Sequence, residues 1–261
     1  MTIKVIVTDL DGTFLRTDKT ISDYSKTILR ECRKRGIKIA YATGRGGSAE
    51  RVAPAEFFDG KITMNGAVAK IGNDVVYDRL IPYQVARPIL TACDKQGIRI
   101  TSEISGIHYS NFPVSDFWSY LTNFKIVDFT KHDLDAEKIY SPAPTEEQKA
   151  FVESLLSNEL YSVMTYDITG MLLNIMNKEA TKAKAVAELA RIWQIEPQHI
   201  IAFGDELNDV DMLDFAGVGV AVGNALNETK MIANHVCDTN DNDGVARFLE
   251  KNLLFEQGGT V

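Results

Sequence analysis

The sequence predicts an α/β protein: a doubly wound, mainly parallel sheet forms the core, and an α+β domain is inserted into it. Near both ends of the chain, apolar strand-like runs alternate with helix-like segments, which is typical of a parallel sheet. Residues 82–177 differ, because their strand-like runs are shorter, alternate in polarity and are separated by tight turns. We therefore predict a core of residues 1–81 and 178–261 and an inserted domain at residues 82–177.

The first elements form a strand-helix-strand unit. Residues 3–8 are rich in Ile and Val, as in a buried parallel strand. Ser22 can cap a helix that ends at Gly36 after three basic residues. Residues 37–42 form the next apolar run, so the unit predicts two parallel strands with a right-handed crossover. Residues 62–64 are expected to add a third strand.

The inserted domain is predicted to contain antiparallel strands and one well-marked helix. The strands are expected at residues 98–102, 106–110, 161–166 and 171–175. Thr145 opens the sequence Thr-Glu-Glu-Gln, a capping box for a helix that extends to about residue 156. We interpret an aromatic group as the core of this domain: Phe112, Phe117, Trp118, Tyr120 and Phe124.

The C-terminal third returns to the alternation of helices and strands. Helices are predicted at residues 182–193, 209–216, 227–234 and 245–253, and strands at residues 200–203, 218–222 and 235–237. Residues 258–261 are expected to form a loose tail.

Composition excludes several classes of function. The net charge of −8 disfavours nucleic acid and anionic membranes as partners, because binding them needs a basic surface. The apolar N-terminal run is interrupted at Asp9, and no run approaches the length of a membrane helix, so we expect a soluble, cytoplasmic protein. The cysteines are far apart, and we interpret them as reduced and structural: Cys32, Cys93 and Cys237.

Two aspartates follow the first predicted strand. Asp9 and Asp11 lie at its carboxyl end, where doubly wound sheets bind ligands. Their carboxylates are expected to point to the same side and to repel each other unless a cation or a shared proton intervenes. Gly12 permits a sharp turn that brings backbone N–H groups toward an anion. A simple turn or helix cap is the alternative, and the Asp-x-Asp pattern alone does not decide between a ligand site and such a turn.

Two further segments carry polar groups suited to phosphate chemistry. Thr43-Gly44-Arg45 offers a hydroxyl, an open backbone N–H and a guanidinium after the second strand, although an ordinary helix start has the same pattern. Lys182 begins a predicted helix and can supply the cation that phosphoryl transfer needs, or be an ordinary solvated lysine.

A second acidic cluster follows the predicted strand at residues 200–203. Asp205 and Asp209 lie in the sequence Gly-Asp-Glu-Leu-Asn-Asp. Carboxylates that converge on one sheet edge favour a hard divalent ion, and oxygen ligands indicate Mg²⁺. Zinc is disfavoured because the histidines are scattered without ligand spacing: His108, His132, His199 and His235.

In their order, these segments resemble the four motifs of the haloacid-dehalogenase-like superfamily. The matching residues are Asp9-Leu10-Asp11-Gly12-Thr13, Thr43-Gly44-Arg45, Lys182, and Gly204-Asp205 with Asn208-Asp209. Further stretches resemble its Cof-like sugar-phosphatase branch: Asn65-Gly66-Ala67, Gly219-Val220-Ala221-Val222-Gly223-Asn224-Ala225 and Asp243-Gly244-Val245-Ala246. The resemblance implies a Rossmann-like core and a large cap inserted between the third core strand and the lysine motif.

The resemblance also implies roles for the acidic residues. Asp9 would be the nucleophile and a magnesium ligand, and Asp11 the general acid and base and a ligand through its backbone carbonyl. Asp205 would be the third protein ligand, and Asp209 would support the metal from behind the ligands. Crowding by Asp9 would raise the pKa of Asp11 and the metal would lower it, so its direction stays open.

The remaining motif residues would bind phosphate. The resemblance implies this role for Thr43, Gly44, Arg45, Lys182 and Asn208. The family usually has Lys-Gly at the lysine motif, whereas this chain has Lys182-Ala183, so Lys184 is kept as the alternate.

We therefore expect a magnesium-dependent phosphatase that hydrolyses small phosphate monoesters, such as sugar phosphates or similar metabolites, through an aspartyl-phosphate intermediate. One alternative is a phosphotransferase or phosphomutase, which uses the same motifs but a second substrate as acceptor. The other is a non-catalytic phosphosugar-binding protein. The oligomeric state is left open.

Overall fold

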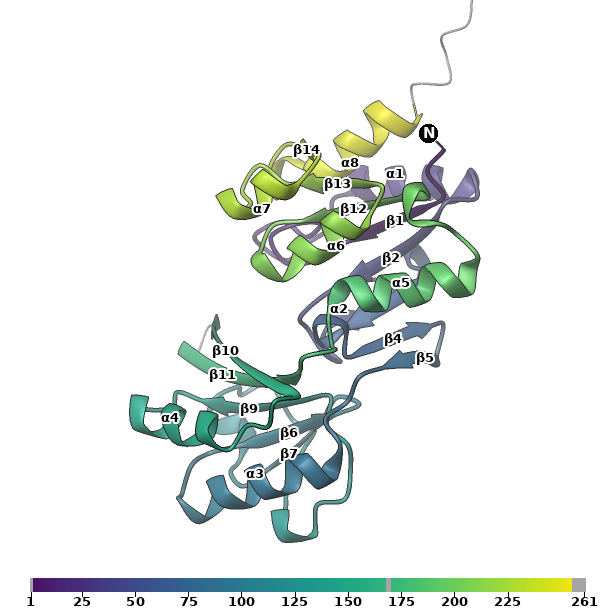
Figure 1. Cartoon of the computed structure of the whole chain (residues 1–261). Coiled ribbons are helices and arrows are strands. Elements are labelled where there is room, and N and C mark those ends of the chain that lie inside the picture. The colour runs from purple at the N-terminus through teal and green to yellow at the C-terminus, as the bar shows by residue number, and fades with distance from the viewer. Residues whose placement is uncertain (1, 168–169, 255–261) are drawn as a thin grey trace, which may run out of the picture. The chain divides into compact units, whose positions relative to one another are not determined.

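The chain forms two compact units (Figure 1), according to a computed structural model that describes residues 2–167 and 170–254. The first, which we call the core unit, comprises residues 2–78 and 181–254. The second, the inserted unit, comprises Arg79–Ala180 except for residues 168–169. The tail expected at residues 258–261 lies outside the described residues.

The core unit contains an eight-stranded sheet in the order β14-β13-β12-β1-β2-β3-β4-β5. Its strands are β1 Val5–Thr8, β2 Lys38–Ala42, β3 Gly60–Thr63, β4 Val68–Ile71, β5 Asp74–Asp78, β12 Ile200–Gly204, β13 Val218–Ala221 and β14 His235–Val236. Pairing is parallel from β14 to β3, which confirms the predicted fold class. The antiparallel β4 and β5, which were not predicted, extend one edge of the sheet. The strand order switches at β1, because β2 and β12 flank it.

Helices cover both faces of this sheet. They are α1 Asp23–Lys34, α2 Ala49–Val52, α5 Lys182–Trp193, α6 Val210–Phe215, α7 Asn227–Ile232 and α8 Gly244–Leu249. Short 3-10 turns are η1 Ala55–Phe57, η2 Met64–Gly66, η5 Pro197–His199, η6 Leu207–Asp209 and η7 Asn240–Asn242, and a π-helical turn, Glu250–Leu254, follows α8. As predicted, the Ser22 side chain caps α1 by accepting from the backbone N of Ser25.

The two faces of β1 explain its apolar sequence. Ile6 packs in one buried cluster with residues of α1 and α8, including Leu29 and Leu249. Val5 and Val7 pack on the other face with residues of α5 and α6. Burial of each such side chain contributes roughly 1.5–3 kcal/mol, so a central strand covered on both faces needs apolar residues at consecutive positions.

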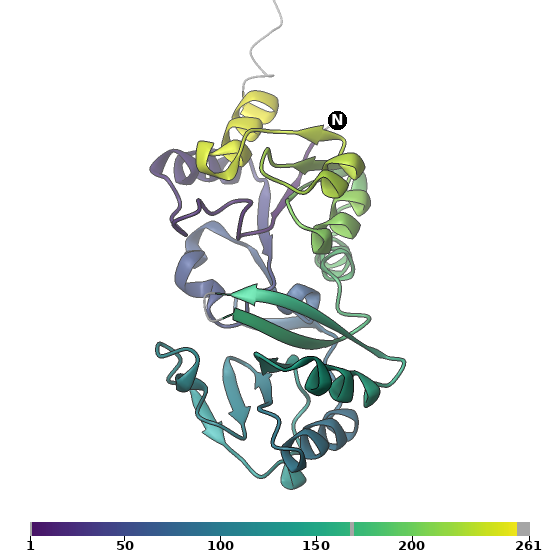
Figure 2. The same ribbon diagram turned by 90° about the vertical axis from the view of Figure 1, so that its left-hand side faces the viewer.

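The inserted unit contains a six-stranded sheet in the order β10-β11-β9-β6-β7-β8. Its strands are β6 Thr101–Ile104, β7 Ile107–Ser110, β8 Phe124–Ile126, β9 Lys138–Pro142, β10 Leu160–Asp167 and β11 Gly170–Asn177. Figure 2 shows the long hairpin of β10 and β11 at one edge. Its helices are α3 Tyr83–Lys95 and α4 Glu146–Ser154, with 3-10 turns η3 Val114–Asp116 and η4 Phe129–Lys131. Both helices contribute to one buried cluster with β9 and β11.

Several predictions for the inserted unit need correction. The strand expected at residues 98–102 spans Thr101–Ile104, and Ile98 and Ile100 are buried in the core of this unit but precede the strand. The strand β8 was not predicted and pairs in parallel with β7, since residues 111–123 form a connection long enough to reverse the chain direction. In the aromatic group, Tyr120 is 52% exposed and does not belong to the core.

Other features of the inserted unit agree with the predictions. Thr145 and Gln148 form both hydrogen bonds of the capping box at the start of α4. Phe112 and Trp118 pack with Tyr140 in a small buried cluster. In neither described part of the chain, residues 2–167 or 170–254, is any helix long and apolar enough to cross a membrane.

Candidate active site

The carboxyl ends of neighbouring parallel strands bring the predicted site residues to one edge of the core sheet. Asp9 follows β1, and Asp205 follows β12, which pairs directly with β1. Thr43 follows β2 on the other side. These strands meet where the strand order switches, which is the usual ligand-binding position in doubly wound sheets.

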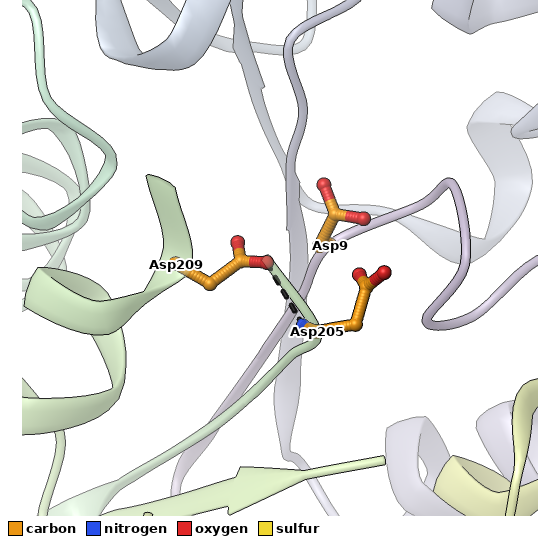
Figure 3. A group of neighbouring side chains, drawn as sticks. All are labelled: Asp9, Asp205 and Asp209. Atoms are coloured by element: carbon orange, nitrogen blue, oxygen red, sulfur yellow. Dashed lines mark hydrogen bonds between the residues drawn. The ribbon is translucent and has the colours of Figure 1, made fainter. Parts of the chain in front are cut away.

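Three aspartates form a buried acidic group at this edge. Asp9, Asp205 and Asp209 each offer a carboxylate oxygen, and these oxygens lie within 4.8 Å of one another. Asp209 shapes the loop after β12, since its Oδ2 accepts from the backbone N of Asp205 at 3.0 Å and of Glu206 at 3.1 Å. Figure 3 shows the Asp209 carboxylate directed at the backbone of Asp205 beside the other two side chains.

Lys182 is the cation of this group. Its Nζ lies 2.7 Å from Oδ1 of Asp9 and 2.6 Å from Oδ1 of Asp209, and its side chain is fully buried. The helix α5 begins at this residue and is capped by the Thr181 hydroxyl, which accepts from the backbone N of Lys184 at 3.3 Å. The Lys184 residue itself is exposed. Of the two lysines considered, the structure therefore brings Lys182 to Asp9.

The acidic group carries more negative charge than Lys182 can balance. Burial, together with the charges of Asp209 and Asp205, raises the pKa of Asp9, although Lys182 opposes the shift. Burial also raises the pKa of Asp205 to about 6, against the hydrogen bond from Thr13. A divalent cation would favour the ionised carboxylates. The donors are oxygen atoms only, which fits Mg²⁺ and does not fit zinc, since zinc prefers nitrogen and sulfur.

Asp11 has different partners from Asp9. Its carboxylate accepts from Arg45, with a distance of 2.7 Å from Nη2, and pairs with Nζ of Lys19 at 2.8 Å. Burial raises the pKa of Asp11, but the hydrogen bonds and charges of Arg45 and Lys19 outweigh burial and hold this pKa below its ordinary value.

Asp9 and Asp11 have separate cationic partners, which are Lys182 for Asp9 and Arg45 with Lys19 for Asp11. The chain turns directly after β1, at Leu10, so the side-chain alternation of an extended strand does not apply between these two aspartates. Arg45, for which phosphate binding stays a prediction, contacts Asp11 in this structure.

The remaining predicted phosphate-binding residues lie near Asn65, which belongs to the Asn65-Gly66-Ala67 stretch noted in the sequence but had no predicted role in the site. Thr43 is buried, and its hydroxyl accepts from the backbone N of Arg45 at 3.2 Å. Nδ2 of the exposed Asn208 donates to Oδ1 of Asn65 at 2.9 Å, and the same Oδ1 lies close to Gly44. Asn65 follows the third parallel strand, and this position, together with the Asn65-Gly66-Ala67 motif, was the sequence signal that could have placed it in the site.

The turn after β1 depends on Gly12. This glycine has φ +78°, and a Cβ on it would lie 2.4 Å from Oδ2 of Asp205. The next residue, Thr13, donates its hydroxyl proton to Oδ1 of Asp205 at 2.5 Å, and Asn224 donates to the carbonyl of Gly12 at 2.7 Å. The turn therefore packs directly against a member of the acidic group.

We expect Gly12→Ala to lower both stability and Mg²⁺ affinity. A left-handed conformation costs an L-residue about 1–2 kcal/mol, and here the added methyl would also displace the Asp205 carboxylate. Gly72→Ala is the matched control, because Gly72 also has a positive φ but nothing lies within 4 Å of its added Cβ. Thermal unfolding and Mg²⁺ titration measure the two effects. Equal Mg²⁺ affinity in both variants would contradict the expected displacement of Asp205.

The fold and the site together place the protein among α/β enzymes whose chemistry takes place at a switch in strand order. Residues 6–249 match the family of haloacid dehalogenase-like hydrolases, and the chain belongs to this family.

Curated relatives and solved structures agree with this assignment. The chain is 29% identical to the Bacillus subtilis 5-amino-6-(5-phospho-D-ribitylamino)uracil phosphatase YitU, over 95% of this chain and 96% of the relative. It is 28% identical to a phosphoglycolate phosphatase of Methanopyrus kandleri, over 95% of this chain and 97% of the relative.

Among solved structures, a HAD-superfamily phosphatase from Bacteroides thetaiotaomicron has a TM-score of 0.81 at 27% identity, covering 96% of this chain and 95% of its own. A sugar phosphatase of HAD subclass IIB has a TM-score of 0.75 at 25% identity, covering 95% and 98%. The predicted family and enzyme class, a phosphatase-type hydrolase, are thus confirmed.

Proposed function

We propose that this phosphatase is magnesium-dependent and hydrolyses small phosphate monoesters through an aspartyl-phosphate formed on Asp9. The observation that carries the proposal is the buried contact of Lys182 with Asp9 inside the acidic group. This arrangement combines a nucleophilic carboxylate, a fixed cation and a set of oxygen donors for a hard metal ion.

The donor set fits Mg²⁺, which would be held by Asp9, Asp205 and the backbone carbonyl of Asp11, with Asp209 behind them. When bound, Mg²⁺ supplies positive charge to the phosphoryl oxygens as the reaction proceeds. The residue Asp209 holds the loop after β12 through the backbone N of Asp205 and contacts Lys182, so it orients both neighbours. These contacts support a positioning role for Asp209.

In the first half-reaction, a carboxylate oxygen of Asp9 attacks phosphorus in line with the leaving oxygen. The new O–P bond forms as the ester P–O bond breaks, and Asp11 gives a proton to the leaving alkoxide. Lys182 neutralises charge on the transferred oxygens. Thr43, Gly44 and Asn208 are proposed to bind these oxygens.

In the second half-reaction, Asp11 takes a proton from water, and the water oxygen attacks phosphorus. Phosphate leaves, and the Asp9 carboxylate is restored. Arg45 and Lys19 hold Asp11 ionised in the resting protein, which suits its role as base. To act as the acid, Asp11 must first take up a proton and exchange these partners for the leaving oxygen.

We propose that the inserted unit is the cap that contacts the leaving group and so selects the substrate. Its place in the chain, between β5 and α5, supports this role. The similar proteins include a sugar phosphatase and a phosphatase of a phosphoribityl compound, which supports phosphorylated sugars or related polyols as the substrate class.

The test is phosphate release from a panel of sugar phosphates, with and without Mg²⁺. We expect release without any added acceptor, loss of activity in EDTA and recovery on adding Mg²⁺. Mg²⁺ should also stabilise the fold by about 2.7 kcal/mol at a hundredfold excess over its Kd, measured by thermal unfolding.

Other results would favour the alternatives. Full activity in EDTA would contradict metal dependence. Phosphoryl transfer only to an added acceptor would indicate a phosphotransferase or phosphomutase, and binding without turnover would indicate a phosphosugar-binding protein.

A further inference from the structure

The turn after β3 has an unusual backbone. Met64, Asn65 and Gly66 all have positive φ, at 50°, 53° and 100°. For residues other than glycine, such conformations cost on the order of 1–3 kcal/mol each and persist only where the surrounding structure holds them. The turn is therefore maintained by its contacts, and its neighbours are three segments of the site.

The first neighbour is the loop after β2. The backbone N of Met64 donates to the carbonyl of Arg45 at 3.0 Å, and the backbone N of Asn65 donates to the carbonyl of Thr43 at 2.9 Å. These two hydrogen bonds bracket Gly44, so the left-handed turn fixes the position of the loop proposed to bind phosphate.

The second neighbour is the start of α5. A Cβ on Gly66 would lie 2.1 Å from the carbonyl oxygen of Thr181 and 2.9 Å from the backbone N of Lys182. Only glycine allows this approach. The turn thus packs against the backbone of the residue that contacts Asp9.

The third neighbour is Asn208, which the side chain of Asn65 contacts through a hydrogen bond. Oδ1 of Asn65 accepts from Nδ2 of Asn208 at 2.9 Å and lies 3.1 Å from the point that a Cβ on Gly44 would occupy. An amide nitrogen carries two N–H groups, so holding one of them fixes the direction of the other.

We infer that Asn65 is a positioning residue that aligns the Asn208 amide with the Gly44 loop for phosphate binding. The inference rests on the proposed function, because it needs phosphate to bind between these segments. Asn65 acts through Asn208 and takes no part in proton or phosphoryl transfer.

Asn65 could instead serve only to stabilise the left-handed backbone of the turn, and the two roles predict different effects of substitution. Asparagine tolerates left-handed backbone better than most residues, which alone could explain its presence. Asn65→Gly keeps this tolerance and removes the amide, so it separates the two roles. Gln194→Gly is the matched control, since Gln194 is exposed, has φ 56° and ends α5.

The experiment is a double-mutant cycle with Asn65→Gly and Asn208→Ala, measuring kcat, KM and competitive inhibition by inorganic phosphate. We expect each single variant to raise KM and the inhibition constant of phosphate about tenfold, as expected for loss of a hydrogen bond to a charged group. The double variant should be little worse than either single one, because both act through the same amide. Gln194→Gly should match the wild type, and melting temperatures report folding.

Two results would overturn the inference: wild-type phosphate inhibition in Asn65→Gly, or full additivity of the two substitutions. If Asn65→Gly does not fold, Asn65→Ala takes its place, since it also removes the amide and adds a backbone cost of only about 1–2 kcal/mol. It should weaken phosphate inhibition about tenfold, and unchanged inhibition would overturn the inference. A wild type that releases no phosphate would instead contradict the proposed function.

Discussion

Asp9→Asn is expected to abolish phosphate release, with kcat reduced by at least about 10⁴-fold, the scale seen when an enzyme loses its nucleophile. The amide cannot form the acyl-phosphate bond, although it fills nearly the same space. Because the substitution removes one of three crowded buried carboxylates, the metal-free protein should remain folded. Phosphate release and the melting temperature measure the two effects.

The matched control for this variant is Asp211→Asn, which changes an exposed aspartate in α6. It should have wild-type activity and stability. Equal rates of phosphate release in Asp9→Asn and the wild type would show that another residue is the nucleophile. Binding of phosphate esters by Asp9→Asn without turnover is expected, and it would allow the bound substrate to be trapped.

Lys182→Met is expected to reduce both stability and activity. The methionine leaves Asp9 and Asp209 without their shared cation, and breaking a buried charge pair typically costs about 3–5 kcal/mol. Activity should fall by roughly 10²–10³-fold, as expected for a lost electrostatic contact to the transition state. Urea unfolding in EDTA measures the first effect, and phosphate release with saturating Mg²⁺ measures the second.

Lys184→Met provides the comparison, because it removes an exposed lysine two residues along the same helix. We expect almost no change in either measurement. If Lys184→Met lost activity while Lys182→Met retained it, the assignment of the cation would be reversed.

Much of the core unit could be predicted because its signals are local. Apolar runs covered on both faces mark the parallel strands, and polar residues directly after them mark the site. The hairpin of β4 and β5 was missed, although Gly72 and Asn73 between two alternating runs were a usable turn signal. Likewise, α3 was not predicted despite its apolar residues at helical spacing, such as Ile89 and Cys93.

The partners of the site residues could not be predicted in the same way. Asp11 contacts Lys19 and Arg45. Arg45 follows β2, whereas Asp11 follows β1. Such pairings depend on where the chain turns after the strand. The alternation of side chains along an extended strand does not predict that turn. The contact of Asn65 with Asn208 likewise joins two distant segments and becomes visible only in the folded structure.

The pairing of β1 with β12 has a consequence for synthesis of the protein. Val5 lies opposite Ile200, so one side of the central strand stays unpaired while the ribosome makes the whole inserted unit. An unpaired apolar strand edge promotes aggregation, and long-range pairing is slow to form. A nascent chain stopped before β12 would also lack Asp205 and Asp209, so release of an incomplete chain yields an aggregation-prone protein without the acidic group proposed to hold Mg²⁺.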